Sequence, residues 1–369
     1  GSILAIGSYK NVNKGSVKVF KYKSGGNWTQ RGLNIIGENT GDGFGKSVSL
    51  SADGSSIAIG APRSDANGTN SGHVSMYVYD ETNKKWFLRG KNIIGSEAGL
   101  KFGISVSLSA DGSVVGISTK SYSGTTCYVR VFENKMQDEW IQRGGCLGGN
   151  EIIEKETYVK LASTGSVVAI SVPEYDDENE VASGLVKVFD YNSFTNKWTQ
   201  IGDTIRGDGN NHMLGRSMDI SSDGSVVAVG GRTNYPAKVY KYNDNSKKWQ
   251  QKGQSIQVDT DATYYGLSLS SSGSIWVVLY SDIVRVLTYD ELTNQWLESS
   301  ANFPVLNYTD YNGEMDSSIL SSADAITVAV NAGDKVDIYQ LESPQVDNSL
   351  ICKGDSFFFN LMIQPDQFP

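Results

Sequence analysis

The chain has 369 residues, a formal net charge of −9, 39% hydrophobic residues, 40 glycines and 7 prolines. This length allows several ordinary domains or one large repeat architecture, and it is enough for a substantial core. The acidic balance, without a clustered basic surface, argues against nucleic acid and anionic lipid as partners. No stretch approaches the roughly 18 apolar residues of a membrane span. Three cysteines and two histidines leave little material for metal or cofactor chemistry, so we expect no cofactor.

One hairpin recurs along the chain from its N-terminus. Residues 44–62 read FGKSVSLSADGSSIAIGAP, and nearly the same string, FGISVSLSADGSVVGIST, begins at residue 102. The Asp-Gly pair between two alternating apolar runs is a strong hairpin signal. A turn glycine, replaced by alanine in the last copy, marks seven copies: Gly1, Gly54, Gly112, Gly165, Gly224, Gly273 and Ala325.

Each copy contains four strand-like pieces. In the second copy these are residues 47–51, 56–62, 73–79 and 86–94. The fourth piece begins with tryptophan in six copies: Trp28, Trp86, Trp140, Trp198, Trp249 and Trp296. A four-stranded unit of about 50 residues that repeats is typical of a propeller. The sequence therefore predicts an all-β fold, a seven-bladed β-propeller of four-stranded antiparallel blades; a linear β-solenoid is the competing architecture.

The two ends of the chain break the pattern. Copy one begins at its turn, so blade one lacks its first strand, and copy seven lacks a Trp-led fourth strand. We assign residues 1–343 to the propeller and 344–369 to a linker and the start of a following β-module, in which Cys352 could pair. The chain would then be one segment of a longer multidomain or filamentous protein. The alternative is that 357–363 folds back to complete blade one or seven.

The Phe-Gly and Gly-Ala-Pro phrases of the hairpin resemble the FG-GAP repeat of integrin α-subunit propellers, especially the integrin-like repeat proteins of algae and other protists. The resemblance covers roughly residues 1–340 and is best in copies two and three. It implies an extracellular or cell-surface protein whose propeller binds other macromolecules.

That family often holds calcium in the loop between the first two strands of a blade. A calcium loop needs several oxygen ligands, but here the loop has shrunk to Ser-Ala-Asp-Gly with one carboxylate. We expect Asp53, Asp111 and Asp223 to be turn formers and predict no metal site. The acidic stretch 173–180 lacks the spacing of a calcium loop and is interpreted as solvated surface.

Two cysteines are placed to form a disulfide. Cys127 begins the third strand-like piece of copy three and Cys146 ends the fourth, equidistant from the turn at 135–138. Pairing in register would bring their Cα atoms to about 4.5–5.5 Å, which suits a disulfide. Two buried thiols in a cytosolic protein are the alternative. An oxidised pair would indicate an extracellular compartment.

Asn-x-Thr triplets agree weakly with that compartment. They stand at Asn27, Asn67 and Asn307, which are therefore glycosylation candidates. Asn67 lies in a long polar loop and is expected to be the most accessible of the three.

The sequence contains no recognisable catalytic motif. His73 and His212 lie in different copies and have no Gly-x-Ser-x-Gly pattern beside them. We therefore expect no enzyme and no catalytic residue. Paired carboxylates from distant blades could still make a polysaccharide-active enzyme.

The function that fits best is an extracellular adhesion or structural-assembly module. It would bind protein or glycan partners, or neighbouring copies of itself, through the loops 63–72, 173–184 and 207–214. A carbohydrate-binding lectin with one stacked tryptophan per repeat is the first alternative. Packing of these tryptophans between blades is the simpler interpretation.

Overall fold

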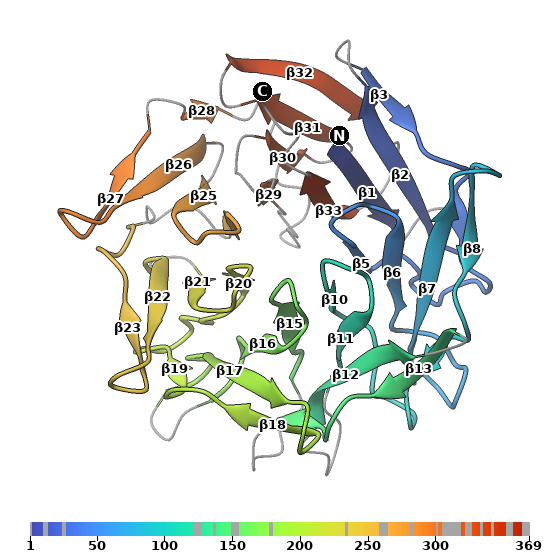
Figure 1. Cartoon of the computed structure of the whole chain (residues 1–369), viewed down its shortest axis with the longest axis horizontal. Coiled ribbons are helices and arrows are strands. Elements are labelled where there is room, and N and C mark those ends of the chain that lie inside the picture. The colour runs from blue at the N-terminus through green and yellow to red at the C-terminus, as the bar shows by residue number, and fades with distance from the viewer. Residues whose placement is uncertain are drawn as a thin grey trace. The chain divides into compact units, whose positions relative to one another are not determined.

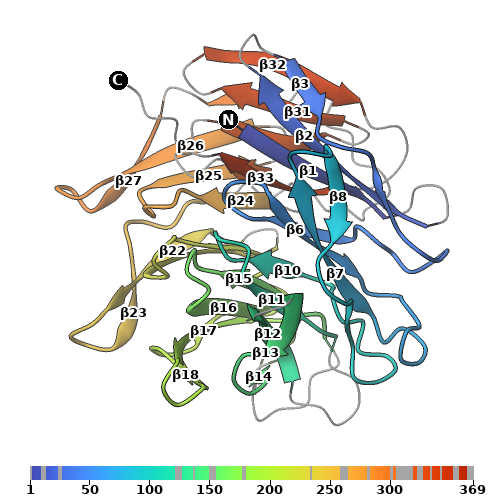
Figure 2. The ribbon, with the colours of Figure 1, turned by 45° about the vertical axis from the view of Figure 1, so that its right-hand side comes forward.

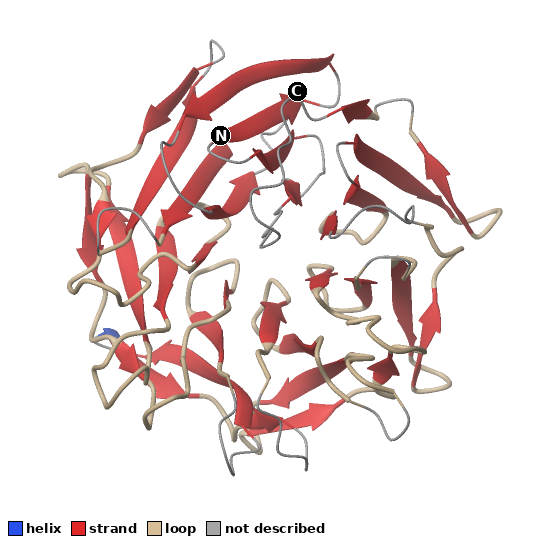
Figure 3. Cartoon of the chain, turned by 180° about the vertical axis from the view of Figure 1, so that it is seen from behind, coloured by secondary structure: helices blue, strands red, loops and turns tan. Residues whose placement is uncertain are grey.

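The structure is a computed structural model of the whole chain. It describes residues 2–9, 14–23, 27–120, 127–135, 138–148, 155–176, 180–232, 235–257, 265–280, 283–299, 302–304, 319–321, 327–332, 335–340, 343–351 and 357–363. Every element in these ranges is a strand, apart from one helical turn at Asp138 (Figure 3). Within the described residues, no helix has the length and apolar character needed to cross a membrane.

The chain divides into two compact units. The first comprises residues 1–166, 191–198 and 353–369, and the second comprises residues 167–190 and 199–352.

Three sheets lie within the first unit, each with its strands in antiparallel order. The first is β3-β2-β1-β33, built from β1 (Ser2–Ser8), β2 (Ser16–Lys23), β3 (Asn27–Gln30), β4 (Ile35–Ile36) and β33 (Phe357–Ile363). The second is built from β5 (Ser47–Leu50), β6 (Ser56–Ala61), β7 (His73–Asp80), β8 (Lys85–Leu88) and β9 (Ile93–Ile94). The third is built from β10 (Val106–Leu108), β11 (Val114–Ser118), β12 (Cys127–Lys135), β13 (Glu139–Gln142) and β14 (Leu147–Gly148).

Three sheets also lie within the second unit. The first is built from β20 (Ser217–Ile220), β21 (Val226–Gly230), β22 (Lys238–Asn243) and β23 (Lys248–Gln251). The second is built from β24 (Tyr265–Leu269), β25 (Ile275–Tyr280), β26 (Ile283–Asp290), β27 (Gln295–Glu298) and β28 (Phe303–Pro304). The third is built from β29 (Ile319–Ser321), β30 (Thr327–Ala332), β31 (Lys335–Gln340) and β32 (Ser343–Ile351). The fourth repeat is divided between the units: β15 (Tyr158–Leu161), β16 (Val167–Val172), β17 (Leu185–Asn192), β18 (Lys197–Gln200) and β19 (Ile205–Arg206).

The fold is an all-β propeller, but the prediction of seven four-stranded blades is wrong. Six blades lie each within one unit, and the blades have four or five strands. The extra strand arises where the fourth strand is interrupted. In the second repeat the Arg89 N–H still donates to the Met76 carbonyl (2.7 Å), and the chain then turns at Gly90 (φ 76°). It rejoins β7 as the two-residue strand β9.

The C-terminal strand completes the first blade. β33 pairs antiparallel with β1 over seven residue pairs, from Ser2 with Ile363 to Ser8 with Phe357. Figures 1 and 2 both show β33 beside β1, near the N-terminus. β32 in turn supplies the fourth strand of the last sheet. The predicted separate β-module at 344–369 is therefore wrong in this region, and the fold-back alternative is correct. Cys352 lies outside the described residues.

Burial along the strands follows from packing on both faces of a blade. All six residues of β6 are buried. Ile57 and Ile59 belong to a core cluster shared with β1 and β2, whereas Ala58 between them packs in a cluster with β10 and β11. Because side chains alternate along a strand, β6 contributes to two successive layers of core.

The Phe-Gly and Gly-Ala-Pro phrases meet where successive blades touch. A Cβ added to Gly60 in β6 would lie 2.2 Å from the carbonyl oxygen of Gly103 in the Phe-Gly pair of the next repeat. Gly103 itself has φ 95°, a conformation that favours glycine. Any side chain at Gly60 would therefore push the two backbones apart, which explains why both positions are glycine.

Candidate functional site

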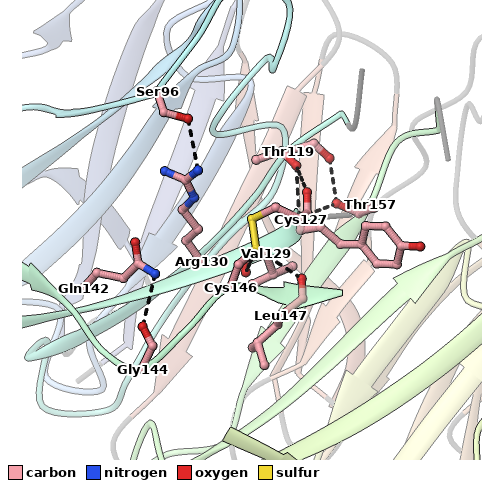
Figure 4. Close-up of a disulfide and its surroundings, with 11 residues drawn as sticks. Ser96, Thr119, Cys127, Val129, Arg130, Gln142, Gly144, Cys146, Leu147 and Thr157 are labelled. Carbon is pink, nitrogen blue, oxygen red and sulfur yellow. Dashed lines mark hydrogen bonds between the residues drawn. A yellow bond between two sulfur atoms is a disulfide. The ribbon is translucent and has the colours of Figure 1, made fainter. Parts of the chain in front are cut away.

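The structure contains a disulfide between Cys127 and Cys146, with a Cα–Cα distance of 5.5 Å (Figure 4). The two residues are not opposite each other as the spacing suggested. Cys127 pairs with Gly148 of β14, and a register shift separates that pair from the pair of Val129 with Leu147. The disulfide thus ties β12 to the segment before β14 across an irregular stretch of the ladder. An oxidised pair is compatible with an extracellular protein.

The tryptophans lie between blades rather than on a shared outer surface. The indole Nε1–H of Trp86 donates to the backbone carbonyl of Arg31 (2.9 Å) in the preceding blade. Trp140, Trp198, Trp249 and Trp296 make the same bond to Arg89, Arg143, Ile201 and Lys252, at 2.7–3.2 Å. These five tryptophans are therefore part of the contact between blades, which removes the repeated stacking platform that the lectin alternative required.

A basic side chain completes four of these contacts. Arg31, Arg89, Arg143 and Lys252 donate to the carbonyls of the hairpin glycines Gly54, Gly112, Gly165 and Gly273, respectively. Lys252 is buried, and its Nζ lies 4.1 Å from the centroid of the Tyr289 ring. Burial lowers the pKa of Lys252, an effect to which Lys241 adds and which Glu291 opposes. We call this arrangement the basic–tryptophan latch.

The hairpin aspartates bond to their own turns. Asp53 Oδ1 accepts from the Ser51 hydroxyl (2.6 Å) and from the Ser55 N–H (2.9 Å). Partial burial acts to raise the pKa of Asp53, but these hydrogen bonds outweigh it and the pKa lies below its usual value. Asp111 and Asp223 bond in the same way. Within the described ranges, no three His, Cys, Asp or Glu side chains are grouped to hold a metal ion.

The loop that precedes the first strand of a blade has the same conformation in three repeats. It comprises residues 37–45, 95–103 and 207–215, and the residue two before its last glycine is left-handed each time: Gly43, Lys101 and Met213. Parallel bridges hold two of these loops, Gly72 with Phe102 and Gly184 with Leu214. We call this region the corner loop. It presents a different set of polar side chains in each repeat.

In the second repeat the corner loop faces His73, the first residue of β7. His73 is 4% exposed, and its buried Nδ1 has no hydrogen-bond partner among the residues that the structure describes. Burial lowers the pKa of His73 below its usual 6.5, and the carboxylates of Asp42 and Glu38 act in the opposite direction. Asp42 is itself buried and accepts a bond from the Asn39 amide (3.3 Å). His73 is thus a neutral core residue.

This pKa predicts an acid sensitivity. Because the folded pKa lies below the unfolded value, the stabilisation by neutral His73 is present above pH 6.5 and is lost as the pH falls through the folded pKa. We expect the free energy of unfolding to decrease as the pH is lowered from 7 through 6.5 and below, and to decrease less in His73→Gln. Urea unfolding of both proteins across this range measures the difference. If the free energies of unfolding of the two proteins changed with pH in parallel, the pKa of His73 would not differ between the folded and unfolded states.

The loop 63–72 is exposed at its tip but held by polar contacts. The Asn67 side-chain amide donates to the carbonyls of Gly95 (3.1 Å) and Ser96 (2.9 Å) in the next corner loop. The Asn70 N–H donates to Asp65 Oδ1 (2.8 Å). Asn67 therefore uses the nitrogen that glycosylation would modify. Of the other two triplets, Asn27 is exposed in β3 and Asn307 lies outside the described residues.

Part of the loop 173–184 is also ordered by its own residues. Asp176 Oδ1 accepts from the Ala182 N–H (2.7 Å), and the buried Tyr175 ring lies 5.4 Å from the Arg206 guanidinium carbon. Residues 177–179 of the acidic stretch lie outside the described residues.

In the fifth repeat four titratable side chains meet at the corner loop; we call them the 208–238 cluster. Asp208 and His212 come from the loop between β19 and β20, and Tyr235 and Lys238 from the connection into β22. His212 Nδ1 lies 3.0 Å from Asp208 Oδ1, and Lys238 Nζ lies 3.5 Å from Asp208 Oδ2. Lys238 Nζ donates to the Tyr235 hydroxyl (3.1 Å).

Sequence reasoning missed this cluster. The loop 207–214 was predicted as a contact surface, and the spacing Asp208-x-x-x-His212 was visible in it. Tyr235 and Lys238 lie more than twenty residues further along, and no local pattern relates them to the loop. Only the pairing of β20 and β21 brings the two segments together.

Comparison with known proteins gives the class of this fold and then a family. The chain is a β-propeller, and residues 37–79 match the FG-GAP repeat. The chain is therefore a β-propeller that contains an FG-GAP repeat. A search of curated protein sequences gives no match.

Solved structures similar to this chain include several propellers. The periplasmic gluconolactonase of Pseudomonas aeruginosa has a TM-score of 0.63 and 14% identity, over 97% of this chain and 98% of that one. A putative 6-phosphogluconolactonase from Bacteroides uniformis has a TM-score of 0.65 and 14% identity, over 97% and 99%. A protein from Lactobacillus plantarum has a TM-score of 0.67 and 14% identity, over 97% and 99%.

These similarities overturn the expectation that the protein is not an enzyme. Proteins named as lactonases share its fold along nearly their whole length. The absence of a local catalytic motif was therefore not a sufficient ground, because a propeller can assemble a site from separate loops. At 14% identity the likeness shows the fold and assigns no activity.

Proposed function

We propose that this FG-GAP propeller is an extracellular adhesion module that binds a macromolecular partner through the loop 63–72. The observation that carries the proposal is the construction of the loop 63–72. Residues 65–69 are exposed, yet the loop is fixed by Asn67, Asn70 and the backbone bond from the Gly72 N–H to the Ser64 carbonyl (2.9 Å). A loop that is ordered before binding loses less conformational entropy when it binds.

The blades supply the rigidity that such loops need. Each described basic–tryptophan latch fixes one blade to the next through hydrogen bonds to backbone carbonyls. The strands that carry the loops are therefore held in place. The disulfide and the FG-GAP repeat support an extracellular location. We favour a protein partner, because the tryptophans that a lectin would use are engaged between blades.

Binding to intact cells tests the proposal. Fluorescent tetramers of the full chain are applied to cells of the species of origin, either untreated or pretreated with protease or glycosidases. We expect binding that protease abolishes and that Ala66→Arg with Thr69→Arg reduces at least tenfold; both residues are exposed, and the bonds that fix the loop use neither side chain. Phe194→Arg, at an exposed position outside this loop, is the matched control. Glycosidase-sensitive binding would favour a lectin, and unchanged binding by the loop variant would refute the assignment.

A further inference from the structure

We propose that the 208–238 cluster is a hydrolytic site, in which His212 activates water for attack on the carbonyl carbon of carboxylic esters and lactones. This inference goes beyond the adhesion function and does not depend on it. It rests on the arrangement of four side chains from two separate segments of the second unit.

Asp208 and His212 form a carboxylate–imidazole pair. With Nδ1 3.0 Å from Asp208 Oδ1, the proton of the neutral imidazole is held at Nδ1, and Nε2 is left as a hydrogen-bond acceptor. A base that is oriented by a carboxylate in this way is the common arrangement for general-base catalysis. The His212 side chain is 29% exposed, so part of the imidazole faces solvent.

The backbone around His212 favours this ring position. A Cβ on Gly209 would lie 2.6 Å from Nε2 and 2.5 Å from Cε1 of the imidazole, so any side chain there would displace the ring. The His212 carbonyl accepts the Arg232 N–H at 2.7 Å, which ties the corner loop to the connection that carries Tyr235. The equivalents of His212 in the other two corner loops are Asp42 and Leu100, so the imidazole is specific to this repeat among the three.

Lys238 and Tyr235 provide the second half of the site. Lys238 Nζ lies between Asp208 Oδ2 (3.5 Å) and the Tyr235 hydroxyl (3.1 Å), so the ammonium contacts the same carboxylate that orients the imidazole. The Tyr235 ring packs on the His212 imidazole with centroids 4.6 Å apart and is 1% exposed. Tyr235 therefore helps to hold both the imidazole and the Lys238 ammonium in place. Burial, with a contribution from Asp208, raises the pKa of Tyr235. The Tyr235 hydroxyl therefore stays protonated near neutral pH. The Lys238 ammonium is the fixed cation of the site, and such a cation stabilises an oxyanion.

The reaction balances without a cofactor. His212 Nε2 takes a proton from water as the water oxygen bonds to the carbonyl carbon, and the carbonyl oxygen becomes an oxyanion beside the Lys238 ammonium. The oxyanion collapses, the bond from the carbonyl carbon to the ester oxygen breaks, and the imidazolium returns its proton to the leaving alkoxide. The product acid then releases its proton to solvent. For a lactone, the acid and the alcohol are the two ends of a single ring-opened molecule.

Hydrolysis by the full chain tests the site. The probes are p-nitrophenyl acetate, followed by absorbance, and δ-gluconolactone, followed in a pH-stat. Because any exposed imidazole hydrolyses an activated ester slowly, each rate is compared with free imidazole at the protein's concentration. We expect at least one probe to be hydrolysed with saturation at a rate at least 100-fold above free imidazole, and His212→Gln to lose at least 100-fold.

Three further variants separate chemistry from folding. Asp208→Asn keeps an oxygen for Nδ1 but cannot stabilise the imidazolium, and Lys238→Met removes the cation, so both should lower kcat more than they raise KM. Asp203→Asn breaks an exposed ion pair with Lys248 (3.9 Å) in the same unit and should leave the rate unchanged. Thermal melts check that each variant is folded. Rates no greater than free imidazole with both probes, or a folded His212→Gln with undiminished rate, would overturn the proposal.

Discussion

Replacement of Trp296 by alanine is expected to lower the free energy of unfolding by about 3–5 kcal/mol, the range for large aromatic side chains removed from a core. Trp296 is 2% exposed and packs beside Trp276 and Tyr289 at ring-centroid distances of 5.6 and 5.1 Å. Its indole nitrogen donates to the Lys252 carbonyl at 2.7 Å, so the substitution removes both core packing and one of the hydrogen bonds between two blades. Chemical denaturation followed by circular dichroism measures the change.

Two comparisons identify the cause of that loss. Leu292→Ala lies in the turn just before the same strand but is 96% exposed, and it should change stability by less than about 0.5 kcal/mol. Trp296→Phe keeps an aromatic ring but leaves the Lys252 carbonyl without its donor, and an intermediate loss is expected. If Trp296→Ala were as stable as Leu292→Ala, the latch would not contribute to stability.

Deletion of residues 357–369 should destabilise the first unit more than any single substitution. β33 covers one edge of β1 along seven residue pairs, and Ile3, Leu4, Ala5 and Ile6 in β1 are each no more than 4% exposed. Without β33 the backbone groups on that edge lose their partners and core residues gain access to water. The loss should exceed about 5 kcal/mol, which is comparable with the total stability of many domains. Thermal melting and soluble yield measure it.

A shorter deletion and a peptide test the mechanism. Removal of residues 364–369 alone leaves β33 intact, so the melting temperature of this variant separates the contribution of β33 from that of the residues after it. Because the deleted strand makes its contacts through backbone pairing with β1, a synthetic peptide of residues 355–365 added to the deletion variant should restore much of the stability. A deletion variant that melts with the full chain would show that β33 is dispensable.

The local features of this protein could be predicted from sequence, because their causes lie within a few residues. The Asp-Gly turns form hairpins, as at Asp53, whose carboxylate bonds within its own turn. The alternation in 47–51 and 56–62 gives paired strands, and the spacing of Cys127 and Cys146 allows a disulfide. The strand register at that disulfide differs from the prediction, because an irregularity in the pairing beside Cys127 shifts the register. The sequence spacing of the two cysteines does not reveal such a shift.

Tertiary structure decided the features that join distant segments. β33 carries none of the repeat's turn or tryptophan signals, and it pairs with β1 because that strand's edge would otherwise be unpaired. The 208–238 cluster likewise depends on β20 and β21 bringing a corner loop to Tyr235 and Lys238. Sequence patterns report turns and strand faces because these depend on neighbouring residues. Which edge is closed, and which loops share a corner, depends on backbone and side-chain contacts between residues far apart in the chain.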